Sequence, residues 1–282
     1  MSERPDAMYE ALARWQLRRR RGLPPGEGLE LRKRLAPPVP GARGPADGGA
    51  GLDAWLRELA GERARGRVLD LGCGFGASLL RWLATGAQSG VGVTASAVQV
   101  ATARQETERR GLAARASFVH GDFTALPPGP FDVVLAIESL GHAHDLAAVL
   151  QRVRAALAPD GVLLLVDDHL RETRNGDDAD VRELARRWRS PRLRSVAELD
   201  EAMISAGFIT LAEHDLTEQV HASDEQVLTS RRRWLQLARL LPMPSSRLVV
   251  DAFLGGIALE RLHRRRLACY RARVATPADQ RP

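Results

Sequence analysis

Two cysteines, Cys73 and Cys269, are all that this 282-residue chain contains. Two thiols cannot build a disulfide framework, and they are too few for a zinc cluster of the usual cysteine-rich kind. Cys73 lies within a short glycine-rich turn, where a small side chain fits. Scarce cysteine is typical of a reducing compartment, so we expect a cytoplasmic protein.

Long hydrophobic runs are also absent from the sequence. The longest, at residues 162–166 and 253–259, fall far short of the ~20 apolar residues that a membrane-spanning helix needs. The amino terminus reads Met-Ser-Glu-Arg-Pro-Asp and carries no apolar segment of the kind found in a secretory signal peptide. We therefore expect no signal peptide and no membrane span.

Basic residues are almost all arginine, and aromatic residues make up only 5% of the chain. The 41 Lys and Arg against 35 Asp and Glu give a formal net charge of +6. An excess of this sign can favour nucleic acid, anionic lipid or an anionic small molecule, although a coding bias toward arginine is the simpler interpretation. The basic clusters at 18–21, 32–34, 231–233 and 264–266 lack the interleaved aromatics of a nucleic-acid groove, so nucleic acid is not an expected partner.

What the sequence does contain is a regular alternation of short strands and amphipathic helices. Mostly apolar strands are predicted at 68–71, 91–93, 117–120, 131–137 and 162–166, with helices at 76–84, 97–110 and 145–157 between them. Residues 159–161, Pro-Asp-Gly, mark a turn before the fifth strand. This alternation predicts an α/β fold, a Rossmann-like, doubly wound, mostly parallel sheet covered on both faces.

The segments outside this core predict additional covers. Residues 1–51 are expected to form an N-terminal cover, a helix at 8–20 followed by a loop rich in proline and glycine. The main domain is predicted over 52–282 and opens with a helix at 52–64. Later elements are expected as a polar loop at 176–180, a helix at 196–206, a strand from 208, a mainly helical stretch at 224–266 interrupted by two prolines, and a last strand at 268–275.

The turn after the first strand, Asp70-Leu-Gly-Cys-Gly-Phe-Gly76, has the composition of a nucleotide site. Glycine lets the backbone turn sharply and approach a ligand, and the helix that follows offers unpaired N–H groups. Gly72, Gly74 and Ala77 also fit the loose dinucleotide pattern G-x-G-x-x-A, which keeps an NAD-dependent oxidoreductase open as an alternative. Asp70 favours another ligand, because its carboxylate would repel a pyrophosphate but not the cationic methionine end of S-adenosylmethionine.

Over residues 52–216 the sequence resembles the class I S-adenosylmethionine-dependent methyltransferases. The resemblance implies that Asp70 and the backbone at Gly72 and Gly74 hold the amino-acid end of S-adenosylmethionine. It implies further cofactor-binding positions after the next three strands, at Thr94, Gln99, Asp122, Phe123 and Ile137. Thr94 stands where the family usually has an acidic residue for the ribose hydroxyls, and its hydroxyl would bond more weakly than a carboxylate.

Two runs resemble the branch of this family that methylates sterols, tocopherols and prenyl compounds. One is Gly-Val-Thr-x-Ser-x-x-Gln, ending at Gln99; the other is Ala136-Ile-Glu-Ser-Leu-Gly-His-Ala-His-Asp145, with His144 in place of a proline. Ligands gather beyond the carboxyl ends of parallel strands, which directs Glu138 toward the transferred methyl group. We predict Glu138 and His142 as catalytic residues that stabilise a developing carbocation and remove a proton. The alternative for Glu138 is a carboxylate that only caps the next helix or contacts the cofactor, and the alternative for His142 is a packed loop histidine.

Aromatic residues from distant segments could line a lipophilic acceptor pocket, and the candidates are Tyr9, Trp15, Trp188, Trp234 and Phe253. The alternative for each of them is packing in the core. The run that begins at Trp188 resembles a lid-forming insertion of the same branch, so lid-like helical insertions are expected at about 170–195 and 222–266. The basic run at 32–34, Arg32, Lys33 and Arg34, could bind a diphosphate if the acceptor is a prenyl diphosphate. A solvated basic face is the interpretation we favour for that run.

Asp167, Asp168 and His169 follow the fifth predicted strand and are all residue types that bind metals. Three contiguous side chains do not readily turn toward one ion, so we predict a solvated loop near the acceptor pocket and no metal site. The sequence as a whole predicts methyl transfer from S-adenosylmethionine to a small lipophilic molecule of secondary metabolism, with C-methylation of a terpenoid, prenyl or sterol-like alkene. O- or N-methylation of a natural product, an RNA methyltransferase, a non-catalytic protein of the same fold and a homo-oligomer stay open.

Overall fold

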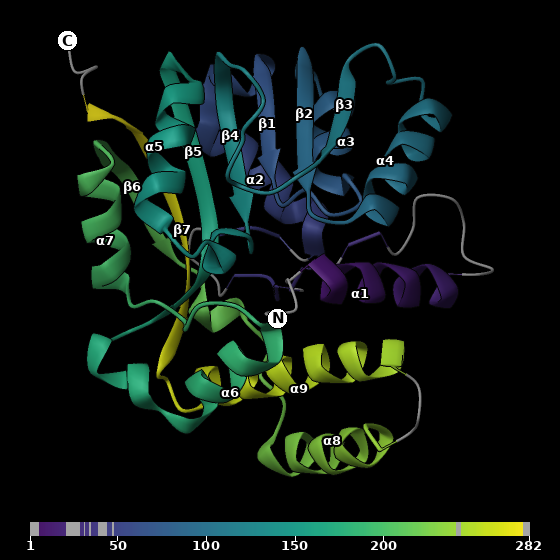
Figure 1. Cartoon of the computed structure of the whole chain (residues 1–282). Helices are drawn as coiled ribbons and strands as arrows, with labels where there is room; N and C mark the ends of the chain where they lie inside the picture. Colours follow the sequence, from purple (N-terminus) through teal and green to yellow (C-terminus); the bar gives the residue numbers. More distant parts are fainter. Residues whose placement is uncertain are drawn as a thin grey trace.

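The computed structural model describes residues 6–20, 29–30, 32–33, 35–38, 44–46, 48–240 and 244–278. Within these residues seven strands form one sheet in the order β3-β2-β1-β4-β5-β7-β6 (Figure 1). The strands span Arg67–Leu71 (β1), Ser89–Thr94 (β2), Ala116–His120 (β3), Phe131–Ile137 (β4), Leu157–Leu170 (β5), Phe208–Asp215 (β6) and Ala268–Pro277 (β7). β7 is antiparallel to both of its neighbours, and the other strand pairs are parallel.

Helices cover both faces of the sheet and span Gly48–Ala60 (α2), Ala77–Ala84 (α3), Ala97–Arg109 (α4), Leu146–Ala156 (α5) and Val196–Ser205 (α7). Successive side chains of a strand point to opposite faces. Val68 of β1 accordingly packs with apolar residues of α2, α3 and α4, while its neighbour Leu69 packs with those of α5 and α7. The predicted doubly wound, mostly parallel α/β fold is confirmed.

A third group of helices lies across the carboxyl ends of the parallel strands: α1 (Asp6–Arg19), α6 (Ala179–Trp188), α8 (Glu225–Ala238) and α9 (Pro244–Arg264) (Figure 1). α9 packs against α1, α6 and α8. The segments expected as an N-terminal cover and as helical insertions therefore meet above one edge of the sheet. The division into domains at residue 51 and the action of these helices as a lid stay predictions.

Local sequence explains where several helices begin. Ser96 accepts a hydrogen bond from the backbone of α4, and Asp145 does the same for α5. α7 begins with a capping box in which Ser195 and Glu198 each bond to the other's backbone. Such caps satisfy N–H groups that the first helical turn leaves unpaired. Short 3-10 turns connect other elements at Gly61–Arg65 (η1), Leu140–His142 (η2), Thr173–Asp177 (η3) and Thr217–Gln219 (η4).

The fifth strand is longer than the sequence predicts. β5 includes the expected turn at 159–161, where its pairing with β4 shifts register, and it continues to Leu170. Asp167, Asp168 and His169 lie inside it, paired with β7 and at most 7% exposed. The prediction of a solvated loop is therefore wrong, because an antiparallel strand from about a hundred residues later covers this segment. The expected polar loop at 176–180 is also shorter, since α6 already begins at Ala179.

The two cysteines lie in the interior. Cys73 and Cys269 are both buried, and neither is in a disulfide. In the part of the chain that the structure describes, no helix combines the length and apolar character needed to cross a bilayer.

Candidate active site

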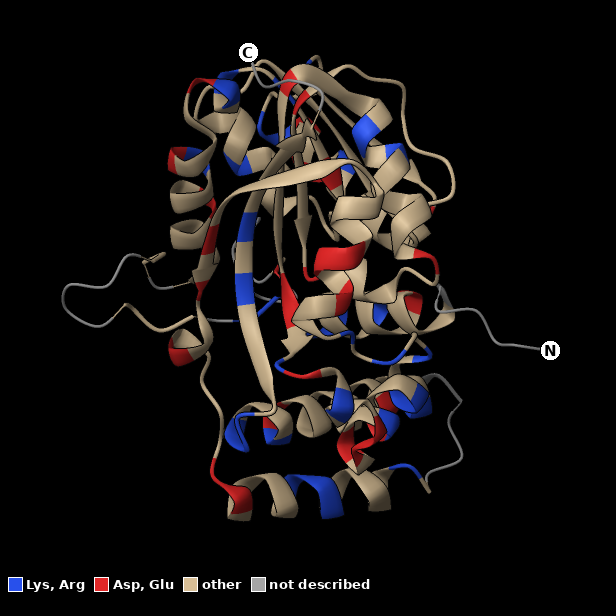
Figure 2. Ribbon diagram, turned by 90° about the vertical axis from the view of Figure 1, so that its left-hand side faces the viewer, with Lys and Arg blue, Asp and Glu red and all other residues tan. Residues whose placement is uncertain are grey.

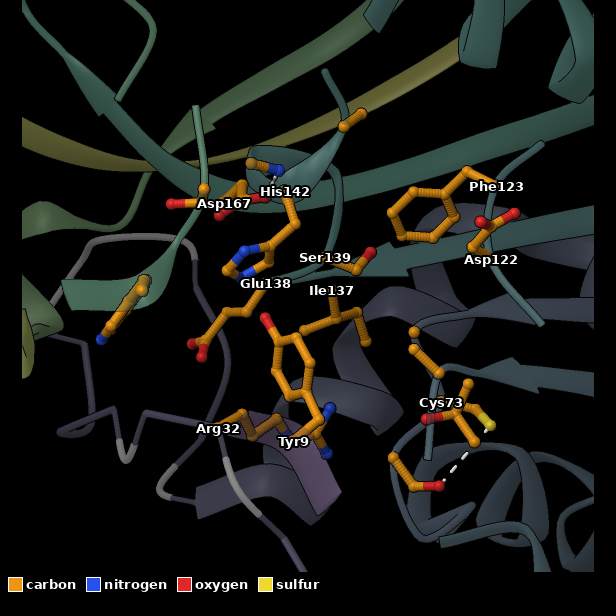
Figure 3. Close-up of a pocket in the computed structure, with 18 of the residues that line it drawn as sticks. Tyr9, Arg32, Cys73, Asp122, Phe123, Ile137, Glu138, Ser139, His142 and Asp167 are labelled. Carbon is orange, nitrogen blue, oxygen red and sulfur yellow. Dashed lines mark hydrogen bonds between the residues drawn. The ribbon is translucent and has the colours of Figure 1, made fainter. Parts of the chain in front are cut away.

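A cavity of about 790 Å³ opens at the carboxyl ends of β1, β2, β4 and β5, beneath α1, α6 and α9. All but one of the residues predicted from the sequence as catalytic, cofactor-binding or substrate-binding line it: Tyr9, Trp15, Asp70, Gly72, Gly74, Thr94, Gln99, Asp122, Phe123, Ile137, Glu138, His142, Trp188 and Phe253. Figure 3 shows Glu138 and His142 on one side of Ile137, and Asp122 and Phe123 on the other. The cavity thus has a glycine-turn side, which includes Asp122 and Phe123, and an aromatic, acidic side, which includes Glu138 and His142. The roles of these residues stay predictions.

The glycine turn has a backbone that only glycine adopts easily. Gly72 and Gly74 have φ of +77° and +54°, in the left-handed region where a Cβ is strained. The turn is tied to β2, because the backbone N–H groups of Gly72 and Cys73 both donate to the carbonyl of Val93. A Cβ on Gly72 would lie 2.5 Å from the Cβ of Ser139, so the turn also depends on close packing against the end of β4.

Asp70 places a nearly unexposed carboxyl group at the cavity floor. It is 3% exposed, and its Oδ2 has no hydrogen-bond partner among the described residues. Burial, and after it the charge of Asp53, raises the pKa of Asp70 to about 7, although Arg32 and Arg81 act in the opposite direction. A buried acceptor atom without a partner is costly unless a ligand satisfies it. A cationic ligand group would do so.

Thr94 and Gln99 act as a pair on the glycine-turn side. The hydroxyl of Thr94 donates to Oε1 of Gln99 at 2.5 Å, and both side chains are buried. This bond turns the amide nitrogen of Gln99 toward Gly74. The α1 helix is fastened to the same loop, because Ser96 donates to Glu10 at 2.6 Å. Glu10 is not predicted from the sequence, since nothing in the local pattern of α1 shows which loop this side chain will contact.

The loop after β3 presents Asp122 and Phe123 to the cavity. Oδ1 of Asp122 accepts hydrogen bonds from the backbone and the hydroxyl of Thr124, at 2.8 and 2.5 Å. These bonds lower the pKa of Asp122 and keep it ionised. Phe123 packs at the edge of the core next to this carboxylate. The pair could contact an adenine through its amine and its ring face.

Glu138 stands immediately after β4, with an unusual backbone, two hydrogen-bond donors and one ammonium group around its carboxylate. Its φ is +50°, which is strained for a residue with a side chain, and its N–H donates to Val166 at 2.7 Å. Oε1 accepts a hydrogen bond from the hydroxyl of Tyr270 at 2.9 Å and from the N–H of Lys33 at 3.1 Å. The ammonium of Lys33 lies 3.8 Å from the same oxygen. This local strain and these long-range contacts together fix the direction of the Glu138 side chain.

The basic run before α2 is engaged inside the protein. Lys33 forms an ion pair with Asp168, and His263 also contacts that carboxylate at 2.6 Å. Burial would raise the pKa of Asp168, but Lys33 and then His263 outweigh it and lower the pKa to about 2. Arg32 pairs with Asp53 at 2.8 Å and has a side chain only 9% exposed. The prediction of a solvated basic face is therefore wrong for these two residues, because carboxylates distant in sequence enclose them; Arg34 lies outside the described residues.

His142 lies among aromatic rings on the other side of the cavity. The ring of Tyr9 approaches it edge-on at 5.4 Å, and the ring of Trp188 lies 5.8 Å away. Burial lowers the pKa of His142 to about 4, so its imidazole is neutral at pH 7. Its Nδ1 has no hydrogen-bond partner among the described residues. Trp15, further out, packs edge-to-face on Phe253 at 5.0 Å, and both line the cavity. Trp234 does not line it and is 72% exposed on α8, so the prediction is wrong for this residue.

Asp167 borders the same region from β5. Its Oδ2 accepts a hydrogen bond from the N–H of Gly141 at 3.0 Å. Burial, and then the neighbouring Asp168, raises the pKa of Asp167 to about 7. Among the described residues no group of three or more metal-ligand side chains comes together around this carboxylate or elsewhere.

Comparison with known proteins agrees with this geometry. The family model described as "Methyltransferase domain" matches residues 47–213. The chain belongs to this family and is a class I S-adenosylmethionine-dependent methyltransferase, which confirms the predicted enzyme class and cofactor. Among relatives by sequence, sterol 24-C-methyltransferase erg6 of Aspergillus fumigatus is 31% identical over 132 residues. That match covers 46% of this chain and only 35% of the relative's length.

Two solved structures share the fold over almost the whole chain. The [4+2]-cyclase SpnF superposes with a TM-score of 0.70 at 21% identity, covering 98% of this chain and 97% of that one. A geranyl diphosphate methyltransferase in complex with GPP and sinefungin gives a TM-score of 0.65 at 17% identity, covering 96% and 97%. At these identities the likeness concerns the fold alone.

Proposed function

We propose that this protein transfers a methyl group from S-adenosylmethionine to an alkene carbon of a lipophilic terpenoid, prenyl or sterol-like molecule. The observation that carries the proposal is the position of Glu138. Its side chain lines the same cavity as the glycine turn, on the side that it shares with His142, and Tyr270 and Lys33 hold its carboxylate in place. The relative named as a sterol C-methyltransferase and the fold neighbour named as a geranyl diphosphate methyltransferase support this class of acceptor.

The described residues fit S-adenosylmethionine on the glycine-turn side. Gly72 and Gly74 leave room for close approach, and the unpartnered Oδ2 of Asp70 suits an ammonium group. Asp122, held ionised by Thr124, suits an exocyclic amine. When bound, S-adenosylmethionine supplies an electrophilic methyl group on a positively charged sulfur. Orientation of the acceptor and exclusion of water are then the tasks of the protein.

The aromatic, acidic side of the cavity suits the positive charge that an alkene acceptor develops during methylation. Its π electrons would form the new carbon–carbon bond to the methyl group while the sulfur–methyl bond breaks and leaves its electron pair on a neutral thioether. A positive charge then remains on the neighbouring alkene carbon. A fixed carboxylate at Glu138 opposes that charge in surroundings where water screens poorly. The acceptor regains neutrality when a proton leaves the carbon next to the charge and a base takes it.

His142 has the properties of the base that this last step requires. A proton beside a carbocation is strongly acidic, so even a weak base can remove it. Burial keeps the imidazole neutral with a pKa of about 4, and its Nδ1 is unpartnered among the described residues. The same low basicity makes His142 poorly suited to a phenol, whose pKa is about 10. This contrast favours carbon over phenolic oxygen as the methyl acceptor.

Replacing Glu138 by Gln tests the proposal, since the side chain keeps its size and loses its charge. We expect S-adenosylhomocysteine to bind within about twofold of wild type by calorimetry, and turnover to fall about 100-fold or more. Turnover is measured by transfer of a labelled methyl group to sterols, prenyl compounds and phenols. Unchanged turnover would remove Glu138 from catalysis. Products that carry the labelled methyl group on oxygen or nitrogen would refute C-methylation in favour of O- or N-methylation. Cofactor binding without transfer to any acceptor would favour a non-methylating reaction on this fold.

A further inference from the structure

The outermost helix of the cover, α8, exposes large apolar side chains. Trp234 and Leu237 are 72% and 60% exposed, and Leu240, just beyond the helix end, is 77% exposed. Their spacing of three residues places them along one outward stripe, since residues three or four apart are neighbours on a helix surface. Val227 extends the stripe at 41% exposed, whereas Leu228 is buried against the rest of the cover. We call this outward surface the α8 stripe.

Three arginines accompany the α8 stripe, and Arg231 donates a long hydrogen bond of 3.4 Å to the hydroxyl of Ser223. Arg231 and Arg233 are exposed, and among the described residues neither has an acidic partner. Arg232, between them, turns inward and pairs with Glu183 of α6 at 2.6 Å. Within the same basic run, Arg232 therefore helps to hold the cover together, whereas Arg231 and Arg233 lie on the surface. Figure 2 shows this basic band in the middle of the lowest helix, which carries acidic residues only at its start.

We propose that the α8 stripe docks on an anionic lipid surface. Helices that lie in a membrane interface place Trp and Leu among the acyl chains and keep basic side chains level with the phosphates. Each Arg near an anionic surface strengthens such binding further. A second copy of the chain fits less well, because a twofold contact through the stripe would bring like charges together. The two exposed arginines of the basic run at 231–233 would then face the lipid phosphates.

The position of α8 connects such a surface with the cavity. α8 packs on α9 and is tied to α6, and these two helices contribute Trp188, Phe253 and Leu259 to the cavity wall. Phe253 is itself 40% exposed while it lines the cavity. A lipophilic acceptor dissolved in the bilayer would have a short apolar path to the aromatic side. Docking does not depend on the proposed function; only this use of it does.

Co-sedimentation of the full chain with vesicles tests the apolar half of the proposal. Phosphatidylcholine vesicles are compared with vesicles of equal parts phosphatidylcholine and phosphatidylglycerol, and we expect the second kind to bind more protein. W234S/L237S should lower binding about tenfold, because two apolar side chains no longer enter the interface. I204S/L211S is the matched control, since these residues are 73% and 55% exposed on α7 and β6. It should bind like wild type.

A second pair of variants tests the basic half. R231Q/R233Q should lower binding to the anionic vesicles about tenfold and leave binding to phosphatidylcholine unchanged. R63Q/R65Q removes the same charge from η1, which precedes β1 at the sheet edge opposite the cavity, and should bind like wild type. The proposal would be overturned if the wild-type protein bound neither kind of vesicle. It would also be overturned if the control variants lost as much vesicle binding as the stripe and arginine variants. A dimer in ultracentrifugation that only the stripe variants dissociate would overturn it too. Unchanged binding of S-adenosylhomocysteine verifies each fold and separates this test from that of the proposed function.

Discussion

The hydroxyl of Tyr270 donates a hydrogen bond to Oε1 of Glu138 across 2.9 Å, which joins the antiparallel strand β7 to the end of β4. Tyr270 is fully buried, and burial, followed by the charge of Glu138, raises its pKa well above the usual value. The phenol therefore stays protonated and always acts as the donor. Tyr270 is a positioning residue, because it lies behind Glu138 and does not line the cavity.

Replacing Tyr270 by Phe should lower turnover about tenfold, because Glu138 loses one of the donors that aim its carboxylate. Binding of S-adenosylhomocysteine should change less than about twofold, since the glycine turn, where we propose that the cofactor binds, lies elsewhere. The double variant Y270F/E138Q should be no slower than E138Q alone if Tyr270 acts through Glu138. Additive losses would instead indicate a general effect of Tyr270 on packing.

Replacing Lys33 by Met should destabilise the protein by about 3 kcal/mol at neutral pH, because it leaves the buried Asp168 without its cation. Denaturant unfolding measures this loss. The pKa of Asp168 in the folded protein, about 2, lies below its ordinary value, so the ion pair stabilises at higher pH. The difference between wild type and K33M should therefore shrink as the pH falls from about 4 toward 2.

R65M provides the comparison for Lys33, because Arg65 pairs with Glu62 at an exposed site. Its cost should be below about 1 kcal/mol. If K33M costs no more than R65M, the pair of Lys33 with Asp168 does not stabilise the fold as argued.

Affinity for S-adenosylhomocysteine should rise as the pH increases through about 7. Burial raises the pKa of Asp70 to about this value, so at lower pH its carboxyl group is protonated and attracts an ammonium group less. The stability of the ligand-free protein should show the opposite trend and fall as the pH increases. A raised pKa means that the folded state holds the proton more tightly, so this group's contribution to stability declines as the pH rises from about 4 to about 7.

Calorimetric titrations of D70N at several pH values check this assignment, and the variant should lose the pH dependence of binding. Asp167 has a pKa raised to about the same value, so D167N is the control and should keep the dependence. If the pH dependence of binding disappeared in D167N rather than in D70N, the titrating group would be Asp167, on the aromatic, acidic side of the cavity.

Replacing Gly72 by Ala should destabilise the protein by about 3 kcal/mol and weaken cofactor binding at least tenfold, because both strain and a close contact with Ser139 arise. G111A separates the two effects. Gly111 has a similar φ of +67°, but a Cβ there meets nothing within 4 Å, so its cost should be about 1 kcal/mol from strain alone. Equal costs in denaturant unfolding would show that the contact with Ser139 is unimportant.

The sequence by itself determined the order of strands and helices along the chain and the position of the glycine-rich turn after β1. These follow from local chemistry: apolar strands that must be covered on both faces, and glycines such as Gly72 whose φ excludes other residues. Parallel strands bring their carboxyl ends to one edge, so residues after different strands, such as Asp70, Asp122 and Glu138, were expected in one cavity and lie in one.

Only the tertiary structure decided the partners of the charged residues. Lys33 meets Asp168, Arg32 meets Asp53, and Tyr270 meets Glu138, each across a long stretch of chain. Whether a charged side chain faces water or a buried partner depends on which distant segments pack together, and no local period records that. The burial of β5 beyond its predicted end has the same cause, because its cover is a strand from the far end of the chain.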